Sequence, residues 1–568
     1  MQHHAWNAKQ REQHIANTQT KEFDLIIIGG GITGAGIARE AALRQLSFCL
    51  LEKNDFAFGT SSRSSKLFHG GLRYLAQFEF GLVRESVTER NWLMNHFPNL
   101  VRPLGFMFCS YEKGKDRPFQ IRYALTMYDI LSNFGTHFKN YRTAKFFTPE
   151  FVEELEPYVA QEHPKLGKLT MAGQYYDTNC DDARVTLEII KESIHLSEGT
   201  SVALNYAKVD NMIRENSGKI KGVQVIDEIN GGNFEIRGKV VVSAVGIWTD
   251  EVMKHTTLKK EKIYPTKGVH VVVPNERIGN QNAFGVRSLD DGRFFFILRR
   301  GKVSVIGTTD TAYYPESKNL NEPWCKKEDC DYLFSTVNQL FPLAKLTYDD
   351  IIGTFAGIRP LIKPDNAKNE SDVSRSHEII DTKEGIVAIG GGKSTTHRLM
   401  AEELLFYLVN NGYLPKFKHT SHSNKGFSMI PFEVGMRKND FYQEVNAKQL
   451  DKNSWPDQLA YLHQQYGQQG ITILEWIKND PLLGKPILEG YPHCKAEIDF
   501  ILEYENAPRL LDVLCRRTEA QWMIWHYKQE DLAKGVADIM ANYYGWSDQK
   551  KASEIDEYIQ YIKNTIWF

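Results

Sequence analysis

Residues 23–75 read FDLIIIGGGITGAGIAREAALRQLSFCLLEKNDFAFGTSSRSSKLFHGGLRYL, and this stretch decides the fold. Residues 25–28 form a continuous apolar run, which is typical of a parallel strand covered on both faces. After a glycine-rich turn we expect a helix over 32–44 and a second strand over 47–51. The order of strand, turn, helix and strand predicts a Rossmann-like unit in an α/β protein.

The turn carries Gly29, Gly31 and Gly34 at GxGxxG spacing. The first glycine permits the tight turn, the second lets a pyrophosphate approach the backbone, and the third lets the helix pack closely on the sheet. The free N–H groups and the dipole at the helix start favour phosphate. Glu52 ends the second strand, close to the position where an acidic residue accepts hydrogen bonds from a ribose. We therefore predict a dinucleotide site, with a βαβ unit that binds no ligand as the alternative.

The loop after this unit distinguishes FAD from NAD as the expected ligand. Residues 59–71, GTSSRSSKLFHGG, are too polar and too rich in glycine to continue directly as a helix. Small hydroxyl groups and backbone amides of this kind suit a loop that wraps along a long, extended cofactor, so we expect FAD. The candidate cofactor contacts of the loop are Thr60, Ser61, Ser62 and Ser65.

Several segments resemble the FAD-dependent, aerobic and membrane-associated glycerol-3-phosphate dehydrogenases. Two of them are TSSRSSKLFHGGLRYL at residues 60–75 and FGLVRESVTERNWL at residues 80–93. LCRRTEAQWM at 514–523 and DIMANYYGW at 538–546 extend the likeness over nearly all of residues 23–568. The resemblance implies FAD as cofactor, sn-glycerol 3-phosphate as substrate, dihydroxyacetone phosphate as product, a quinone as electron acceptor and a possible homodimer.

The order of the remaining elements predicts three parts. Alternating strands over 264–273, 294–299 and 303–307 lie between glycine-rich segments, and helical patterns take over from about Gly426. We therefore expect an α/β fold with a discontinuous FAD-binding domain, an inserted antiparallel-sheet substrate domain and an α-helical C-terminal domain. The expected boundaries are 23–104, 171–263 and 347–415 for the FAD-binding domain, 105–170 and 264–346 for the substrate-binding or cap domain, and 416–568 for the helical domain.

Two later strands also end in glycine, where ligands sit in open α/β sheets. VVVSAVGIW at 240–248 contains Gly246, and GIVAIGGGKSTTHR at 385–398 contains Gly391 and Gly392. The helix after the second turn would stabilise negative charge on a reduced flavin. Both segments resemble the family, and their departures from its usual pattern are Val245, Ile247 and His397.

The composition excludes several classes of protein. The formal net charge of −2 and the pI near 6.8 argue against a nucleic-acid binder. No apolar run approaches the roughly 18 residues that a transmembrane helix needs. Residues 1–22 lack the apolar core of a secretion signal, so we expect a disordered or extended tail. Seven scattered cysteines, without the spacing of a metal site, favour a reducing cytoplasm over a disulfide framework.

Residues 117–134, RPFQIRYALTMYDILSNF, predict a helix that is apolar around most of its circumference. Basic residues on either side fit a helix that lies in the headgroup region of a membrane without crossing it. A buried cap-domain helix with solvated ends is the alternative. The family that this chain resembles is membrane-associated. We therefore favour the interpretation that this helix binds the inner face of the cell membrane. The basic residues are Lys113, Lys115, Arg117, Arg122, Lys139, Arg142 and Lys145.

Oxidation of a phosphorylated alcohol by a flavin requires a group of cations that binds the phosphate. Arg73, Arg359 and Lys393 lie beside glycine or apolar segments, where uncompensated charge is unfavourable and a dianionic phosphate would compensate it. Tyr74 can add a hydroxyl group. The family resemblance places its active-site positions on these residues, and a structural pair with a nearby carboxylate is the alternative for each arginine.

The reaction also requires a base for the hydroxyl proton. We assign this role to His270, because a neutral imidazole takes up a proton near pH 7, with a hydrogen-bonded core histidine as the alternative. Arg359 is the second catalytic candidate, since it can orient the alkoxide as well as bind phosphate. Asp310 is either a residue that caps its loop or one that orients the basic groups.

Three other functions compete with the dehydrogenase. A glycerol-3-phosphate oxidase would pass the electrons to oxygen and make hydrogen peroxide; such oxidases often carry an insert that is not evident here. An amine or amino-acid oxidase would need less positive charge around a carboxylate substrate. A non-catalytic flavin-binding scaffold would bind FAD without turnover.

Overall fold

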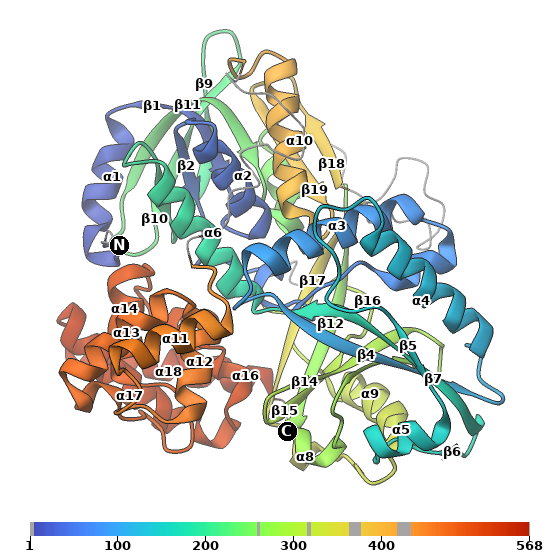
Figure 1. Ribbon diagram of the computed structural model, residues 1–568. Coiled ribbons are helices and arrows are strands. Elements are labelled where there is room, and N and C mark those ends of the chain that lie inside the picture. The colour runs from blue at the N-terminus through green and yellow to red at the C-terminus, as the bar shows by residue number, and fades with distance from the viewer. Residues whose placement is uncertain are drawn as a thin grey trace.

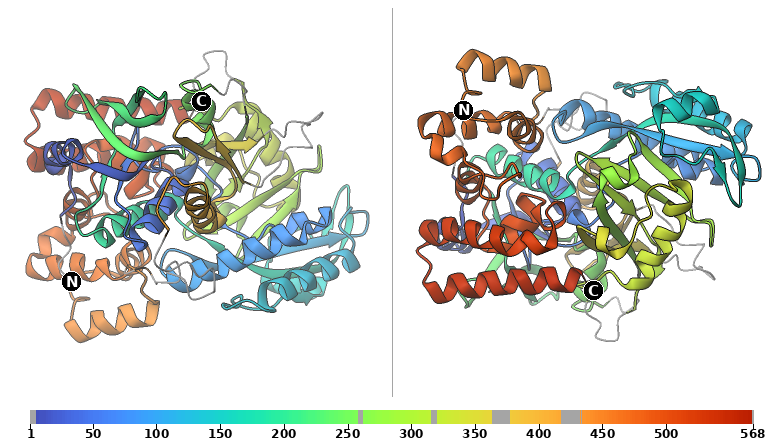
Figure 2. Two further views of the ribbon diagram at one scale, coloured as in Figure 1. Left: turned by 90° about the horizontal axis from the view of Figure 1, so that it is seen from above. Right: turned by 90° about the horizontal axis from the view of Figure 1, so that it is seen from below.

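The computed structural model describes residues 5–257, 262–314, 320–362, 377–416, 432 and 434–566. Two β-sheets and a group of C-terminal helices make up this part of the chain (Figure 1). The C-terminal helices lie toward one side of the molecule and the second sheet toward the other in both views of Figure 2. The predicted α/β fold with a second, mainly antiparallel sheet and helices at the C-terminus is confirmed.

The first sheet is built on β1 (Glu22–Ile28), the predicted apolar strand. It pairs in parallel with β11 (Asn233–Ser243) on one side and with β2 (Phe48–Leu51) on the other. The register places Ile28 beside both Leu51 and Ser243, so the carboxyl ends of these strands meet at one edge, where ligands bind in open α/β sheets. The other strands of this sheet are β8 (Val202–Leu204), β9 (Ala207–Arg214), β10 (Ile220–Asp227), β18 (His377–Asp381) and β19 (Ile386–Gly391).

Three helices pack together on the first sheet: α2 (Ile32–Leu43), α6 (Asp182–Leu196) and α10 (His397–Asn410). Small residues make close packing possible, since a Cβ atom on Gly36 would lie only 3.1 Å from the carbonyl oxygen of His397. The faces of these helices are buried against the sheet, and the resulting hydrophobic core holds the first sheet and its helices together.

The second sheet contains β12 (Ile263–Pro274) and β17 (Gly353–Ile362), which pair antiparallel from Ile263 with Ile362 to Val272 with Gly353. The expected boundaries placed β17 and most of β7 (Gly167–Asn179) in the FAD-binding domain. Both strands belong to the second sheet, because β17 pairs with β12 and β7 pairs with β4. The remaining strands are β3 (Leu67–Phe68), β4 (Arg102–Tyr111), β5 (Lys145–Phe147), β6 (Glu162–His163), β13 (Ala283–Arg287), β14 (Phe294–Arg300), β15 (Val303–Gly307) and β16 (Thr311–Ala312).

Helices cover both faces of the second sheet. On one face α9 (Lys327–Leu340) and α5 (Pro149–Leu155) enclose an apolar core, and on the other α3 (Phe80–His96) and α4 (Pro118–Asn133) enclose another. The short helices α7 (Thr249–Met253) and α8 (Asn275–Ile278) follow β11 and β12.

The C-terminal helices join the first sheet through buried ion pairs. Asp55, in the loop after β2, contacts Arg517 at 2.7 Å and Arg516 at 2.5 Å, and these side chains are almost entirely buried. Burial alone would raise the pKa of Asp55, but the charges of the two arginines hold it at about 2. The helices are α11 (Lys438–Lys448), α12 (Pro456–Tyr466), α13 (Gln469–Asn479), α14 (Lys495–Tyr504), α15 (Leu510–Asp512), α16 (Ala520–Met523), α17 (Gln529–Tyr544) and α18 (Asp548–Thr565). Gly426, the expected start of helical patterns, lies outside the described residues.

The prediction of a disordered or extended N-terminal tail is wrong for the described part of it. Residues Arg11–Gln19 form α1, and Trp6 is buried against Phe56. Arg11 binds Asp227 at 2.7 Å with both side chains buried. The sequence did not indicate these contacts, because the segment is mostly polar and only a few of its residues, such as Trp6 and Arg11, are buried.

The predicted amphipathic helix is α4, which begins at Pro118. It buries Ile121, Leu125 and Tyr128 against the second sheet, so its apolar residues do not all face solvent. Its other side exposes several large apolar side chains, considered below. Among the described helices, none combines the length and apolar character that crossing a lipid bilayer requires.

Candidate active site

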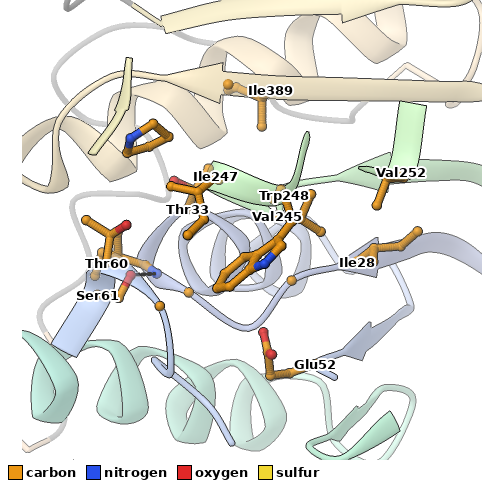
Figure 3. A pocket seen from close by; sticks show the side chains of 18 of the residues that line it. Ile28, Thr33, Glu52, Thr60, Ser61, Val245, Ile247, Trp248, Val252 and Ile389 are labelled. Carbon is orange, nitrogen blue, oxygen red and sulfur yellow. Dashed lines mark hydrogen bonds between the residues drawn. The ribbon is translucent and has the colours of Figure 1, made fainter. Parts of the chain in front are cut away.

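A cavity of about 500 Å³ lies at the carboxyl edge of the first sheet, over the start of α2 (Figure 3). Its apolar walls come from strand residues such as Ile28 and Ile389 and from Trp248, which follows β11. A ligand that is partly apolar and partly anionic fits such a cavity, because its charge can lie at the helix start. The predicted cofactor residues that line it are Gly29, Gly31, Glu52, Thr60, Ser61, Gly246, Gly391 and Gly392.

The glycine turn has the geometry that the sequence predicted. Gly29 adopts φ +108°, and a Cβ atom on it would lie 2.6 Å from the carbonyl oxygen of Ala244, the residue after β11. Gly34 does not line the cavity, but a Cβ atom there would lie 1.9 Å from the carbonyl oxygen of Gly29. Gly34 therefore serves the close packing of helix on sheet. The N-cap residue Gly31 has no side chain to cap α2, and Ser61 from the loop takes the N–H of Ile32, so the other N–H groups of the first turn remain suited to an anion.

Glu52 points toward the glycine turn. Its carboxylate accepts hydrogen bonds from the backbone N–H of Gly30 at 2.8 Å and of Asn54 at 2.9 Å. Burial raises the pKa of Glu52. These two bonds fix the orientation of the carboxylate and leave acceptor capacity for a ribose hydroxyl.

The serine-rich loop divides into two parts. Ser61 accepts a hydrogen bond from the N–H of Ile32 at 2.9 Å, and Thr60 donates to the carbonyl oxygen of Ile358 at 2.6 Å, so both residues tie the loop to the cavity. Ser62 and Ser65 do not line the cavity. Ser65 lies 3.0 Å from His270, so its hydroxyl meets the imidazole.

FAD fits this chemistry better than a dinucleotide confined to the first glycine turn. The cavity extends from Glu52 at one end to Gly391, Gly392 and Lys393 at the turn after β19. The 3-10 turn Ser394–Thr396, which leads into α10, begins at this second glycine turn, and Ser394 lines the same cavity. The residues present therefore suit a long cofactor that spans both turns.

One group of cationic and aromatic side chains lies beside the second turn. The ammonium nitrogen of Lys393 lies 4.2 Å from the ring centroid of Tyr74 and donates to Ser86 at 3.1 Å. Arg73 donates to the Tyr74 hydroxyl oxygen at 3.2 Å. Tyr74 is buried and Arg73 is exposed, so this group runs from the cavity wall to the surface. The structure thus brings together three of the four predicted substrate-binding residues.

His270 belongs to a second group, on the second sheet. Its ring stacks on Phe355 with centroids 4.6 Å apart, and its Nδ1 is buried with no hydrogen-bond partner among the described residues. Burial, and then the charge of Arg359, lower the pKa of His270 to about 3. The imidazole is therefore neutral at pH 7, as predicted, and it is a weaker base than an ordinary histidine.

Arg359, on β17, is in this second group with His270. It donates to Asp310 at 2.8 Å and to the hydroxyl oxygen of Thr308 at 3.2 Å. Asp310 thus acts as an orienting residue for the arginine. Pro360, the next residue along β17, lines the cavity together with Lys393, so both groups adjoin it.

Sequence reasoning missed the residue that holds the serine-rich loop. Asp182, at the start of α6, accepts hydrogen bonds from Ser64 at 2.6 Å and from the ammonium group of Lys66 at 2.7 Å. The Asp182 and Lys66 side chains are both buried, and Asp182 also lines the cavity. The paired aspartates at 181–182 were a usable signal, because acidic residues at the start of a mostly buried helix need partners.

Two sequence families match the chain. One is described as FAD dependent oxidoreductase and matches residues 24–401; the other is described as C-terminal domain of alpha-glycerophosphate oxidase and matches residues 435–551.

Curated relatives match almost the whole chain. Glycerol-3-phosphate dehydrogenase 2 of Mycobacterium tuberculosis is 35% identical over 549 residues, which cover 96% of this chain and 88% of that protein. Aerobic glycerol-3-phosphate dehydrogenase of Staphylococcus aureus is 33% identical over 561 residues, 97% of each chain.

Solved structures show the same fold. Glycerol-3-phosphate dehydrogenase from Bacillus halodurans, complexed with FAD, superposes with a TM-score of 0.78 at 28% identity, covering 99% of this chain and 98% of that one. L-alpha-glycerophosphate oxidase from Mycoplasma pneumoniae, with FAD bound, gives a TM-score of 0.54 at 17% identity, covering 72% and 98%, which is a likeness of fold alone.

Proposed function

The chain belongs to the FAD-dependent glycerol-3-phosphate dehydrogenases, and we propose that it oxidises sn-glycerol 3-phosphate to dihydroxyacetone phosphate and passes the electrons to a quinone. One observation supports this substrate above the others: Lys393 lines the cofactor cavity and also stacks on Tyr74, which binds Arg73. A dianionic phosphate has the negative charge that complements these two cationic side chains.

FAD, when bound, supplies a flavin ring whose N5 accepts the hydride from C2 of the alcohol. Lys393 and Arg73 bind the phosphate, and the Tyr74 hydroxyl donates a hydrogen bond to it. Arg359, held by Asp310, binds the oxygen at C2 and stabilises its negative charge as the proton leaves. These contacts orient the C2 hydrogen and restrict the substrate to one pose.

His270 accepts the hydroxyl proton. Its low pKa in the free protein reflects burial and the positive charge of Arg359, and a dianionic substrate nearby would raise that pKa. The hydrogen bond between Ser65 and Nε2 fixes the ring, while the buried Nδ1 is free to take up a proton.

We place the protein on the inner surface of the cell membrane, as expected for a donor of electrons to a lipid-soluble quinone. Helix α4 exposes Phe119 to 70%, Tyr123 to 59% and Ile130 to 49%, and Phe134 follows at 79%. Exposed aromatic residues on a helix with basic neighbours suit the headgroup region.

Anaerobic titration of the FAD-loaded protein with sn-glycerol 3-phosphate tests the reaction. We expect the yellow flavin absorbance to bleach and one dihydroxyacetone phosphate to form per flavin. Persistence of the colour at millimolar substrate, in folded and flavin-loaded protein, would exclude the dehydrogenase and favour a scaffold.

Oxygen is the second candidate acceptor, because the C-terminal family that matches residues 435–551 takes its description from an oxidase. Under air, hydrogen peroxide formed at the rate of substrate loss would identify an oxidase. Peroxide formation much slower than quinone reduction supports the dehydrogenase.

A further inference from the structure

A second cavity, of about 260 Å³, opens within the second sheet, away from the residues that line the cofactor cavity. Strands β4 and β13 pair only at Phe106 with Ala283 and at Met107 with Phe284. Beyond those pairs the two strands separate, and the cavity occupies the space between them. Diverging strands leave backbone N–H and C=O groups without strand partners, so this cavity has polar groups within apolar walls.

The walls are apolar and partly aromatic. Phe108, Cys109, Phe284, Val286, Leu340 and Phe341 contribute to them. The rim is charged: Arg287 forms a two-point ion pair with Asp116, and Lys115 lies beside them. A cavity of about 150 Å³ holds a benzene ring, so 260 Å³ is enough for one substituted ring.

A straight row of residues links this cavity to the candidate active site. Across the sheet, His270 pairs with Gly307, Gly307 with Phe296, and Phe296 with Gly285, which lines the second cavity. Three strand spacings of about 4.8 Å place Gly285 roughly 14 Å from His270. The ring of Phe296 also lies 6.3 Å from that of His69, in the loop beside the cofactor cavity.

The rim of the cavity leads to the exposed side of α4. Lys115 and Asp116 directly precede this helix, and Phe119 in its first turn is 70% exposed. A molecule dissolved in a membrane under α4 would therefore meet the rim of the cavity first.

We propose that this second cavity binds the ring of a membrane quinone, with the isoprenoid tail leaving past the rim toward α4. This inference rests on the proposed function and locates its second half-reaction. The strand edges donate hydrogen bonds to the quinone carbonyl oxygens, and Lys115 on the rim stabilises negative charge as the ring is reduced, whereas the charge of Arg287 is offset by Asp116. The reaction balances, since the quinone takes up two electrons and two protons to become a quinol while the two-electron-reduced flavin returns to its oxidised form.

Cavity-filling variants test the site. Cys109→Phe on β4 and Val286→Phe on β13 each place an aromatic ring in the cavity. The control is Leu343→Phe, at a residue of the same domain that is 67% exposed. We expect both cavity variants to retain flavin, to bleach with sn-glycerol 3-phosphate and to reduce ferricyanide within twofold of the unaltered protein. Their reduction of decylubiquinone should fall at least tenfold, and the control should be unaffected.

A photoreactive azidoquinone gives a readout that needs no turnover. We expect it to label residues 106–116 or 283–292 in the FAD-loaded protein, and excess decylubiquinone to prevent the labelling. Full quinone reduction by both cavity variants, or labelling confined to residues of the cofactor cavity, would overturn the site. Loss of bleaching in the unaltered protein would instead overturn the proposed function.

Discussion

The hydroxyl oxygen of Ser65 lies 3.0 Å from Nε2 of His270, and this contact joins the cofactor-binding loop of the first sheet to a strand of the second. Buried Lys66, the next residue, is held by Asp182 at 2.7 Å. The loop that surrounds the expected cofactor therefore also sets the orientation of the imidazole.

His270→Ala should lower kcat by about 10²–10⁴-fold and change KM much less, because the proton acceptor acts mainly in the transition state. The measurement is the anaerobic rate of flavin bleaching at saturating substrate. Ser65→Ala, which removes the contact but not the imidazole, should have a smaller effect. A rise in KM with unchanged kcat would reverse the assigned role.

Lys393→Ala should raise KM for sn-glycerol 3-phosphate roughly 10–100-fold, since a hydrogen bond to a charged group contributes about 1.5–3 kcal/mol. Lys302→Ala is the control, because that side chain is 83% exposed. Steady-state kinetics with a soluble acceptor will distinguish them. Equal KM values in the two variants would remove Lys393 from the phosphate site.

Acid should destabilise the protein through two buried histidines. Burial lowers the pKa of His270 to about 3 and of His397 to about 4, whereas an unfolded histidine titrates near 6.5. The unfolded state therefore binds more protons below pH 6.5, so the stabilisation present above that pH is lost as pH falls toward the folded values. Each histidine contributes up to about 1.4 kcal/mol per pH unit in that window.

The variant His397→Phe isolates one of these contributions. Its thermal midpoint should depend less steeply on pH between 6.5 and 4.5 than that of the unaltered protein. Parallel pH curves for the two proteins would show that His397 is not held neutral.

Arg517→Met should destabilise the protein by up to about 3–5 kcal/mol, because it removes one of the two arginines that neutralise the buried Asp55 and leaves Arg516 as the remaining cation. Limited proteolysis and thermal melting should both show loosened attachment of the C-terminal helices. The exposed pair of Lys302 with Asp457 is the comparison, and Lys302→Ala should cost less than about 1 kcal/mol.

Phe119→Ser combined with Phe134→Ser should weaken binding to anionic phospholipid vesicles at least tenfold, since both rings are largely exposed on the proposed membrane face. Phe151→Ser, at an exposed position on α5, is the matched control. Vesicle sedimentation provides the measurement, and activity with a soluble acceptor should not change. Undiminished sedimentation would exclude α4 as the contact.

The nucleotide half was predictable because its signals are local. The strand of residues 25–28, the glycines at 29, 31 and 34, and Glu52 all lie within one βαβ unit, where spacing along the chain fixes spacing in the fold. The same reasoning predicted α4 but not which of its apolar residues are buried, since that depends on the sheet beneath it.

The contacts between distant segments could not be predicted in this way. Arg359 was assigned to the FAD-binding domain with its glycine-rich neighbours, but the pairing of β17 with β12 places it opposite Thr266, on the strand that carries His270, and its charge lowers the pKa of that histidine. Asp182 binds Lys66, which lies 116 positions away along the chain. The paired aspartates indicate that a partner is needed, but no local pattern identifies Lys66 as that partner. The second cavity arises from two strands that separate, which is a property of the sheet rather than of either strand.

The attachment of the N-terminus has a consequence for biosynthesis. Asn7 binds Glu503, 496 positions later, and Trp6 donates its backbone N–H to the same glutamate's carbonyl oxygen at 3.2 Å. A ribosome that adds roughly 5–20 residues per second needs about 25–100 s to make the intervening chain. The hydrogen bonds of residues 6 and 7 with Glu503 therefore form only after the segment around Glu503 has been made, although Trp6 can already pack on Phe56.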